Sequence, residues 1–387
     1  MAATTGQVAP AQEAGRPQPQ TTVEPPGGPF VRHSQPGRRL QYALVNQAFG
    51  GVITQPLVAV PGYVARFRIR VAATGGSGGA ATTVAADAPF NCAALVTLRD
   101  AFGTPLIVGP GYQMLYLVPK YSSQFGLFSQ SDLKNFVVFS AVSSPSGVGE
   151  GNFTFATCLP LEFAKAYGLI SMANASLLPT LNIQLNAASA LYTANPPGTL
   201  PVMEWDIDAD FYWLPEGVAI EPPGLGTTCQ WVFQACNPTI ASQSSTPVTL
   251  PRLGGFLHTL IFELRDSTGV RIDAYGTRLR IYVDGVPLMD TRFDEMQDDM
   301  QIQYGCATTA QWARDTGIMV LTRRTSLSQI NLGLLDTGEV FLSTNPGTLV
   351  QVECSPWGTI SNAPATLNAI VGQVVPAGSL LQGLPEL

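Results

Sequence analysis

An internal repeat constrains the fold of this chain more than any other feature. Residues 163–185 match residues 312–334 without a gap, at a constant offset of 149 (312 − 163). Both segments hold an aromatic residue, a cation, a glycine and an apolar pair in the same order. We predict one short helical turn in each, closed by Gly168 or Gly317 in the left-handed region and followed by an apolar strand.

A second block contains a tight turn. Asn-Pro-Pro-Gly-Thr-Leu at 195–200 resembles Asn-Pro-Gly-Thr-Leu at 345–349. Proline followed by glycine predicts a type II turn with positive φ at Gly198 and Gly347. Replacing Gly347 by valine should then cost about 1–2 kcal/mol, with a similar cost at Gly198.

Further blocks follow in the same order in both copies, with offsets that fall along the chain. The matched ranges, first copy before second, are 40–44 and 229–233, 62–64 and 255–257, 98–103 and 264–269, 114–118 and 280–284, 181–185 and 330–334, and 200–205 and 349–354. The pairing of 62–64 with 255–257 is the loosest. Several collinear matches indicate a duplication, so we predict two similar domains.

Composition favours an all-β fold. Charged residues make up only 12% of the 387 residues, while 38 glycines and 31 prolines punctuate short apolar runs. Such runs at regular spacing predict two tandem eight-stranded jelly rolls, which are β-sandwiches, with short helices and long loops. Example strands are 63–71, 94–98, 113–118, 136–142 and 152–157, then 258–264, 279–283, 318–322 and 340–343. The best helix is 291–304, with Thr291 as N-cap and Asp294 in the capping box.

The domain organisation follows from the repeat and from the composition of the ends. Residues 1–38 are rich in Pro, Gln and Thr, which predicts a flexible arm. The tail is apolar and uncharged, interrupted by Pro364 and Pro376, and we expect a second arm that packs on a partner. The predicted parts are an N-terminal arm at 1–38, a first jelly roll at 39–215, a linker at 216–228, a second jelly roll at 229–360 and a C-terminal arm at 361–387.

The residue types argue against an enzyme. The chain has two histidines, His33 in the predicted arm and His258 in a predicted strand, whereas a double-cupin active site needs two or three histidines in each barrel. A Ser-His-Asp or Cys-His arrangement could use only His258, which has no partner motif in the sequence. The six cysteines lack CxxC spacing and predict buried free thiols. We predict no catalytic residue, no cofactor-binding residue, no metal ligand and no cofactor.

Asp206, Asp208 and Asp210 alternate along one strand and therefore share a face. Their spacing resembles the start of a calcium loop, but Phe211 and Gly217 stand where that loop needs glycine and glutamate. We interpret them as a polar outer face, with a surface cation at an interface as the open alternative. The glycine-rich run 75–79 lacks the lysine of a phosphate loop and predicts a hairpin tip.

The charge balance limits the partners. The net charge is −7, and the first 39 residues carry four arginines against two glutamates. A protein that coats nucleic acid directly usually has a strongly basic arm, so we predict no sequence-specific nucleic-acid binding. The ends show no signal peptide, and no apolar run reaches the length of a membrane span. We therefore expect synthesis in a cytoplasm.

Two tandem jelly rolls, two arms and the repeated turn-strand blocks resemble the double jelly-roll major capsid proteins of tailless icosahedral double-stranded DNA viruses, including membrane-containing phages and the adenovirus-like lineage. The resemblance covers about residues 40–360. It implies a homotrimer whose six rolls form a pseudo-hexagonal capsomer, many of which close a virion shell. It further implies contacts with neighbouring capsomers, with minor capsid and vertex proteins, and of the termini with an internal viral membrane.

Two other classes stay open at this point. A two-jelly-roll coat protein of a positive-strand RNA virus fits the fold, but it would more naturally show a basic arm. A secreted carbohydrate-binding double β-sandwich fits the strand pattern, but it would need a secretion signal.

Overall fold

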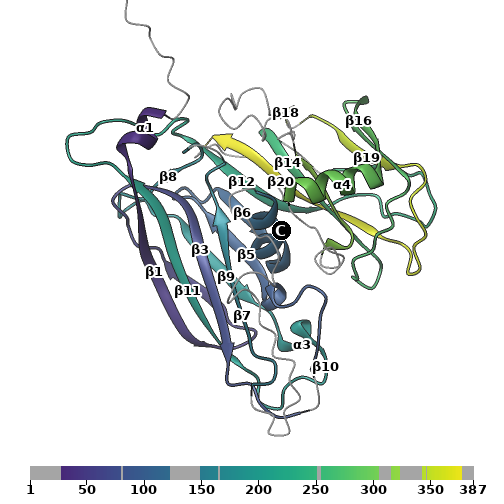
Figure 1. Ribbon diagram of the computed structural model, residues 1–387, viewed down its shortest axis with the longest axis horizontal. Helices are drawn as coiled ribbons and strands as arrows, with labels where there is room; N and C mark the ends of the chain where they lie inside the picture. Colours follow the sequence, from purple (N-terminus) through teal and green to yellow (C-terminus); the bar gives the residue numbers. More distant parts are fainter. Residues whose placement is uncertain are drawn as a thin grey trace, which may run out of the picture.

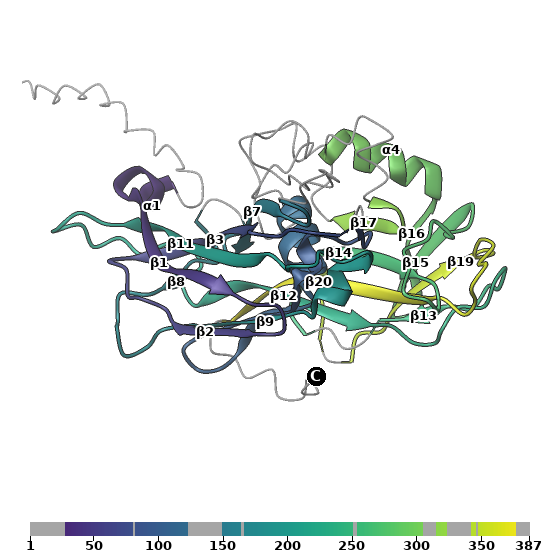
Figure 2. The same ribbon diagram turned by 90° about the horizontal axis from the view of Figure 1, so that it is seen from below.

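The computed structural model describes residues 28–79, 82–122, 149–163, 166–250, 254–304, 315–322, 342–345 and 347–376. They form two β-sandwiches placed side by side (Figures 1 and 2). The short helical segments are α1 (Gly28–His33), η1 (Phe90–Cys92), η2 (Gln113–Leu117), α2 (Val118–Tyr121), α3 (Ala188–Leu191) and α4 (Phe293–Tyr304). They lie at strand ends and between the rolls, so the strands set the architecture.

The first sandwich has two sheets of four main strands each. One sheet has the order β1 (Gln35–Gln47), β11 (Val202–Trp213), β3 (Tyr63–Thr74) and β7 (Phe153–Pro160). The other has the order β2 (Val52–Pro56), β9 (Thr180–Leu185), β5 (Ala93–Arg99) and β6 (Pro105–Gly109). The short strands β4 (Thr83–Val84), β8 (Ile170–Ser171) and β10 (Tyr192–Ala194) lie at the margins.

The second sandwich repeats this arrangement. One sheet has the order β12 (Thr227–Ala235), β20 (Thr366–Pro376), β14 (Phe256–Arg265) and β17 (Ile318–Thr322), and β18 (Leu342–Ser343) also pairs with β14. The other has the order β13 (Val248–Thr249), β19 (Val350–Cys354), β15 (Arg278–Val283) and β16 (Val286–Arg292). If the eight main strands of each sandwich are counted along the chain, both sandwiches show the orders 1-8-3-6 and 2-7-4-5. The prediction of two eight-stranded jelly rolls is confirmed.

A single nine-stranded sheet runs through both rolls, which the sequence did not predict. Strand β6 of the first roll pairs in parallel with β12 of the second, so two half-sheets become continuous. Side chains of β12, β14, β17 and β20 also pack into the first roll's core, including Trp231, Ile261, Ile318 and Ile370. The second roll keeps its own core around Phe262 and Trp357.

Burial on both faces explains the main error in the domain boundaries. Residues 367–375 of β20 are all buried, and β20 lies between β12 and β14 in the middle of the sheet. A strand covered on both faces is apolar without alternation. The predicted C-terminal arm at 361–387 is therefore wrong in its first half, where the eighth strand of the second roll lies.

The predicted N-terminal arm and one predicted strand also need correction. Residues 28–38 form α1 and the start of β1, anchored by the buried ring of Phe30 against Tyr63 and Tyr212. Residues 113–117 form the helical segment η2 rather than a strand. Their apolar run reflects a helix buried on all sides, which periodicity cannot distinguish from a buried strand. The predicted strand at 136–142 lies outside the described residues.

The repeat is real at the level of topology, but its sequence alignment is partly wrong. The matches of 40–44 with 229–233 and of 62–64 with 255–257 join strands that occupy the same place in their sheets, β1 with β12 and β3 with β14. Two other matches are one strand out of step. The first joins the end of β5 (98–103) to the end of β14 (264–269), whose counterpart is β3. In the second, residues 349–354 belong to β19, whose counterpart is β9, not β11. Residues 114–118 are helical, so their match with 280–284 in β15 joins a helix to a strand. Residues 330–334, matched to β9, lie outside the described residues.

Local turn chemistry explains one of the false matches. The segments after β5 and β14 both use an aspartate whose side chain accepts backbone N–H bonds, Asp100 from Phe102 and Thr104 and Asp266 from Thr268 and Val270. Both turns also hold a glycine with positive φ, 86° and 82°. The same short sequence therefore builds the same turn after strands that are not equivalent.

The predicted glycines and caps gave mixed results. Gly168 and Gly317 have φ of 89° and 73°, as predicted, and each precedes a strand. Gly198 and Gly347 do not have positive φ, so the type II turn prediction is wrong. Gly198 instead lies against the backbone of Ser77 and Gly78, and it donates a 2.6 Å bond to the Gly78 carbonyl. The run 75–79 leads from β3 toward β4, which pairs with β10 and not with β3, so the predicted hairpin tip is wrong.

Two helical predictions were also tested. Ala166 has φ of 69°, so the residues before Gly168 include a left-handed turn, while residues 164–165 and 312–314 lie outside the described ranges. Helix α4 confirms a helix in the predicted region but begins at Phe293, so the prediction of Thr291 as N-cap is wrong: Thr291 lies in β16. Glu295, not Asp294, binds the residues before the helix. Its carboxylate accepts from Thr291 Oγ1 at 2.9 Å and from the Arg292 backbone at 3.4 Å.

Candidate functional site: the junction between the two rolls

The junction is built first of apolar strand edges. The parallel pair of β6 and β12 places Ile107 opposite Trp231 and Val108 opposite Val232. Ile107 and Trp231 are buried. Gly372, on the neighbouring β20, has no side chain because an added Cβ would lie 2.5 Å from the Trp231 ring. The two rolls therefore meet through apolar strand edges, and within the second roll β20 packs closely against the Trp231 ring.

Charged side chains also form hydrogen bonds across this contact. Asp87 of the first roll accepts hydrogen bonds from two arginines of the second, from Arg265 at 2.6 Å and from Arg271 at 2.9 Å. Arg271 also donates to the carbonyl of Ala86, and its guanidinium lies 4.7 Å from the ring centre of Tyr112. Charge-assisted bonds of this kind fix geometry strongly.

Glu263 of β14 is a second centre of this network. Its side chain is fully buried, and it accepts a 2.8 Å bond from Gln113 of η2. Arg265 donates to its other oxygen, and Asn368 of β20 lies at 3.4 Å. Burial opposes the charge on Arg265, but Glu263 and Asp87 outweigh it and raise the Arg265 pKa. Arg265 therefore keeps its positive charge in this network.

The helical segment η2–α2 supplies a third contact. Lys120 of α2 forms a buried ion pair with Asp315 of the second roll. The Lys120 ammonium also lies 5.4 Å and 5.2 Å from the ring centres of Tyr116 and Tyr121. Tyr116 and Lys120 are four residues apart and therefore share one helix face. The strand predicted at 113–118 would place Gln113 and Tyr116 on opposite faces, because side chains alternate along a strand.

Sequence reasoning missed the residues of this junction. Asp87, Glu263 and Arg271 belong to no sequence motif, because Asp87 pairs with Arg271 across the two rolls and Glu263 binds Gln113 of the other roll. The only available signal was a charge inside an apolar run, as at Glu263 in 257–264, since buried charges are rare unless paired.

The aspartate cluster of β11 has a structural explanation. Asp210 accepts hydrogen bonds from Arg38 and Arg66 at 2.8 Å and from Arg68 at 2.5 Å. Burial opposes its ionisation, but these bonds outweigh it and lower the Asp210 pKa. Asp206 lies 3.9 Å from Arg70. The polar face is thus an ion-pair ladder across three strands, with β11's buried side chains on the opposite face.

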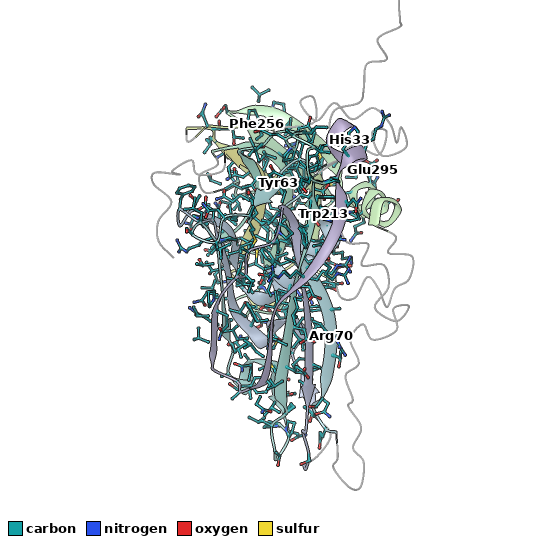
Figure 3. The ribbon with its side chains drawn as sticks, turned by 90° about the vertical axis from the view of Figure 1, so that its left-hand side faces the viewer. His33, Tyr63, Arg70, Trp213, Phe256 and Glu295 are labelled. Carbon is teal, nitrogen blue, oxygen red and sulfur yellow. The ribbon has the colours of Figure 1, made fainter. Side chains whose placement is uncertain are left out.

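The two histidines occupy different environments. His33 is exposed on α1, at the same end of the molecule as Phe256 and away from Arg70 (Figure 3). His258 is buried, with its Nε2 3.0 Å from the Cys229 sulfur, its Nδ1 3.0 Å from the Thr259 hydroxyl and its ring against Trp231. The structure therefore brings a cysteine to His258 that the sequence did not indicate, inside the packed sheet.

Several other predictions concern single groups. Five cysteines are buried thiols without a disulfide bond, as predicted: Cys92, Cys158, Cys229, Cys236 and Cys354. Cys306 lies outside the described ranges. Burial raises the pKa of the Cys158 thiol to about 12. Within the described residues, no three His, Cys, Asp or Glu side chains are placed to hold a metal ion. No described helix has the length and hydropathy needed to span a membrane.

Comparison with known proteins identifies the fold. No protein-family model matches the sequence. No curated protein matches it either. Solved virus structures do match: the major capsid protein of STIV (TM-score 0.61, 13% identity, 90% of this chain and 100% of that chain) and a chain of Sulfolobus turreted icosahedral virus (0.58, 15%, 91% and 94%). The major capsid protein P2 of bacteriophage PM2 also matches (0.51, 10%, 89% and 100%). The chain thus has the double jelly-roll fold of these major capsid proteins.

Proposed function

We propose that this protein is a structural major capsid protein, without enzymatic activity, of an icosahedral virion. Three copies form a pseudo-hexagonal capsomer in this proposal, and many capsomers form the shell. The observation that carries the proposal is the presence in one chain of two rolls with the same strand order, joined edge to edge. Six similar rolls in a homotrimer approximate a hexagon, which tiles a shell.

The junction supports a structural role. Ion pairs join the two rolls there, between Asp87 and Arg271 and between Lys120 and Asp315. Such contacts hold the rolls in one orientation, which a tile needs in order to present the same edges to each neighbour. The match to solved capsid proteins over about nine tenths of both chains supports the same role.

The chain ends support an orientation of the capsomer. Helix α1 precedes β1, and β20 ends against the start of β12, so residues 28 and 376 lie at the same end of the strands. In the proposed shell this end faces inward, toward an internal membrane or neighbouring capsomers. Minor capsid and vertex proteins complete the partners, and the protein is made in the host cytoplasm before it enters the virion.

Mass in solution tests the proposal. The expected species is a trimer of about 123 kDa (3 × 41.0 kDa), measured by light scattering after size exclusion. Electron microscopy of the same sample should show a particle with a six-sided outline. A protein that stays monomeric at micromolar concentration, with no such particle, would contradict the proposal.

A further inference from the structure

Two strand edges at opposite sides of the molecule have no described partner. Strand β1 ends one sheet of the first roll, and β16 ends one sheet of the second. They lie at the two lateral extremes of the molecule (Figures 1 and 2). Both expose apolar side chains, Leu40 and Val45 on β1 at 54% and 58%, and Val286 on β16 at 65%. Long exposed edges of this kind favour pairing with another chain.

The internal repeat indicates which partner fits these edges. Counted along each roll, β1 and β12 are both first strands, and β6 and β16 are both fifth strands. Inside the chain, the fifth strand β6 of the first roll pairs with the first strand β12 of the second. The remaining first and fifth strands are β1 and β16, whose outer edges are unpaired among the described residues.

We propose that β16 of one copy pairs in parallel with β1 of the next copy, so that each contact between subunits repeats the contact between the two rolls within a chain. This inference rests on the proposed function. The interface is heterologous, because each copy contributes two different edges. Its parallel direction follows from the chain, since β6 and β12 are parallel and each roll repeats the same strand order.

The register can be carried over from the internal contact. Trp231 and Val232 lie opposite Ile107 and Val108. In the match of 40–44 with 229–233, these two β12 residues correspond to Tyr42 and Ala43. Ile107 and Val108 are the second and third residues after Pro105, the first residue of β6. The residues at the same distances from Val286, the first residue of β16, are Leu288 and Met289. We therefore place Tyr42 and Ala43 of one copy opposite Leu288 and Met289 of the next.

Charge complementarity supports the same pairing. Residues 28–47, which include α1 and β1, hold three arginines and no acidic residue. Residues 284–299, which include β16 and the start of α4, hold six acidic residues and one arginine. Arg38 and Asp294 are 52% and 60% exposed. Opposite charges on two facing edges favour this encounter and disfavour pairing of either edge with itself.

A cysteine pair across the proposed contact tests it. In the double variant Ala43→Cys with Met289→Cys, every copy gives one thiol to each neighbour, so mild oxidation or a short bismaleimide should yield covalent trimers on a reducing-agent-free gel. Covalent dimers from Ala43→Cys alone would instead show β1 facing β1 and overturn the proposal. If the double variant is a trimer by mass but forms no covalent trimer, the strand pairing is overturned and the proposed function is left intact. If the wild-type protein forms no trimer, both the strand pairing and the proposed function are overturned.

Two controls show whether the cross-linking is specific to the proposed contact. Wild-type protein measures cross-linking by the native cysteines. The pair Val52→Cys with Thr249→Cys lies on β2 and β13, the second strand of each roll. These two strands also end their sheets but take no part in the proposed contact, so this pair should not link copies.

Hydrogen exchange of the wild-type trimer gives a readout that needs no variant. Amides on the outer edges of β1 and β16 should exchange at least tenfold more slowly than those on the outer edge of β2. Equal exchange at β1 and β2 would also contradict the pairing.

Discussion

Removal of the Asp87 carboxylate should weaken the junction between the rolls by an amount that the structure sets. Arg265 and Arg271 are only 18% and 4% exposed at their side chains, so neither can recover its lost partner fully from water. Breaking a buried ion pair by removing one member costs about 3–5 kcal/mol. Arg265 keeps Glu263, and Arg271 keeps two backbone carbonyls. We therefore expect a cost at the lower end, about 3 kcal/mol, for Asp87→Ala.

The assay is urea denaturation followed by tryptophan fluorescence, at one fixed protein concentration because assembly changes apparent stability. Asp206→Ala is the matched control, since Asp206 lies 3.9 Å from the exposed Arg70 on the outer face of β11 and β3. Exposed pairs contribute little, so this control should not shift the midpoint measurably. Adding Arg271→Met to Asp87→Ala should restore part of the loss, because it removes the buried unpaired charge. A loss no greater than that of Asp206→Ala, or no recovery in the double variant, would refute the reasoning.

Three further predictions concern single positions. Because its arginine partners lower the Asp210 pKa, its contribution to stability is present at neutral pH and is lost as the pH falls below about 4; Asp210→Asn should therefore flatten the acid limb of stability measured against pH, and an unchanged limb would exclude this role. Gly317→Ala should cost at least about 1–2 kcal/mol, because its φ is 73° and the added Cβ would lie 2.9 Å from two carbonyl oxygens, while Gly347→Ala should be close to neutral in thermal melts. Equal melting shifts for the two alanines would contradict the backbone argument. Gly372→Ala should destabilise by about 1–3 kcal/mol and shift the fluorescence of Trp231, since the new methyl overlaps its ring; an unshifted spectrum with wild-type stability would show that the sheet has room there.

The alternating strands were predictable because each has one solvent-exposed face and one buried face. In β3 and β11, buried side chains alternate with exposed or half-buried ones, so residues 63–71 and the start of β11 could be read directly. The strand and the helical segment that were missed lack this alternation. β20 is covered on both faces, and η2 is covered on all sides, so their apolar runs carry no period that separates a strand from an arm or a helix.

The alignment of the two copies failed for a related reason. Turns after Asp100 and Asp266 are built by contacts within a few residues, so equal sequences give equal turns wherever they stand. A strand's place in a sheet depends on partners far along the chain, which no local match records. The pairing of residues 62–64 with 255–257 was the weakest match by sequence, yet the sheet order supports it.

The sequence by itself determined the all-β class, the doubling of the domain and the outward face of the aspartate ladder, because periodicity and turn chemistry are local properties. Only the tertiary structure decided how the two rolls are joined. The pairing of β6 with β12 and the meeting of Asp87 with Arg271 join residues more than 100 positions apart. Such contacts depend on the packing of whole sheets, so no single segment of the sequence encodes them.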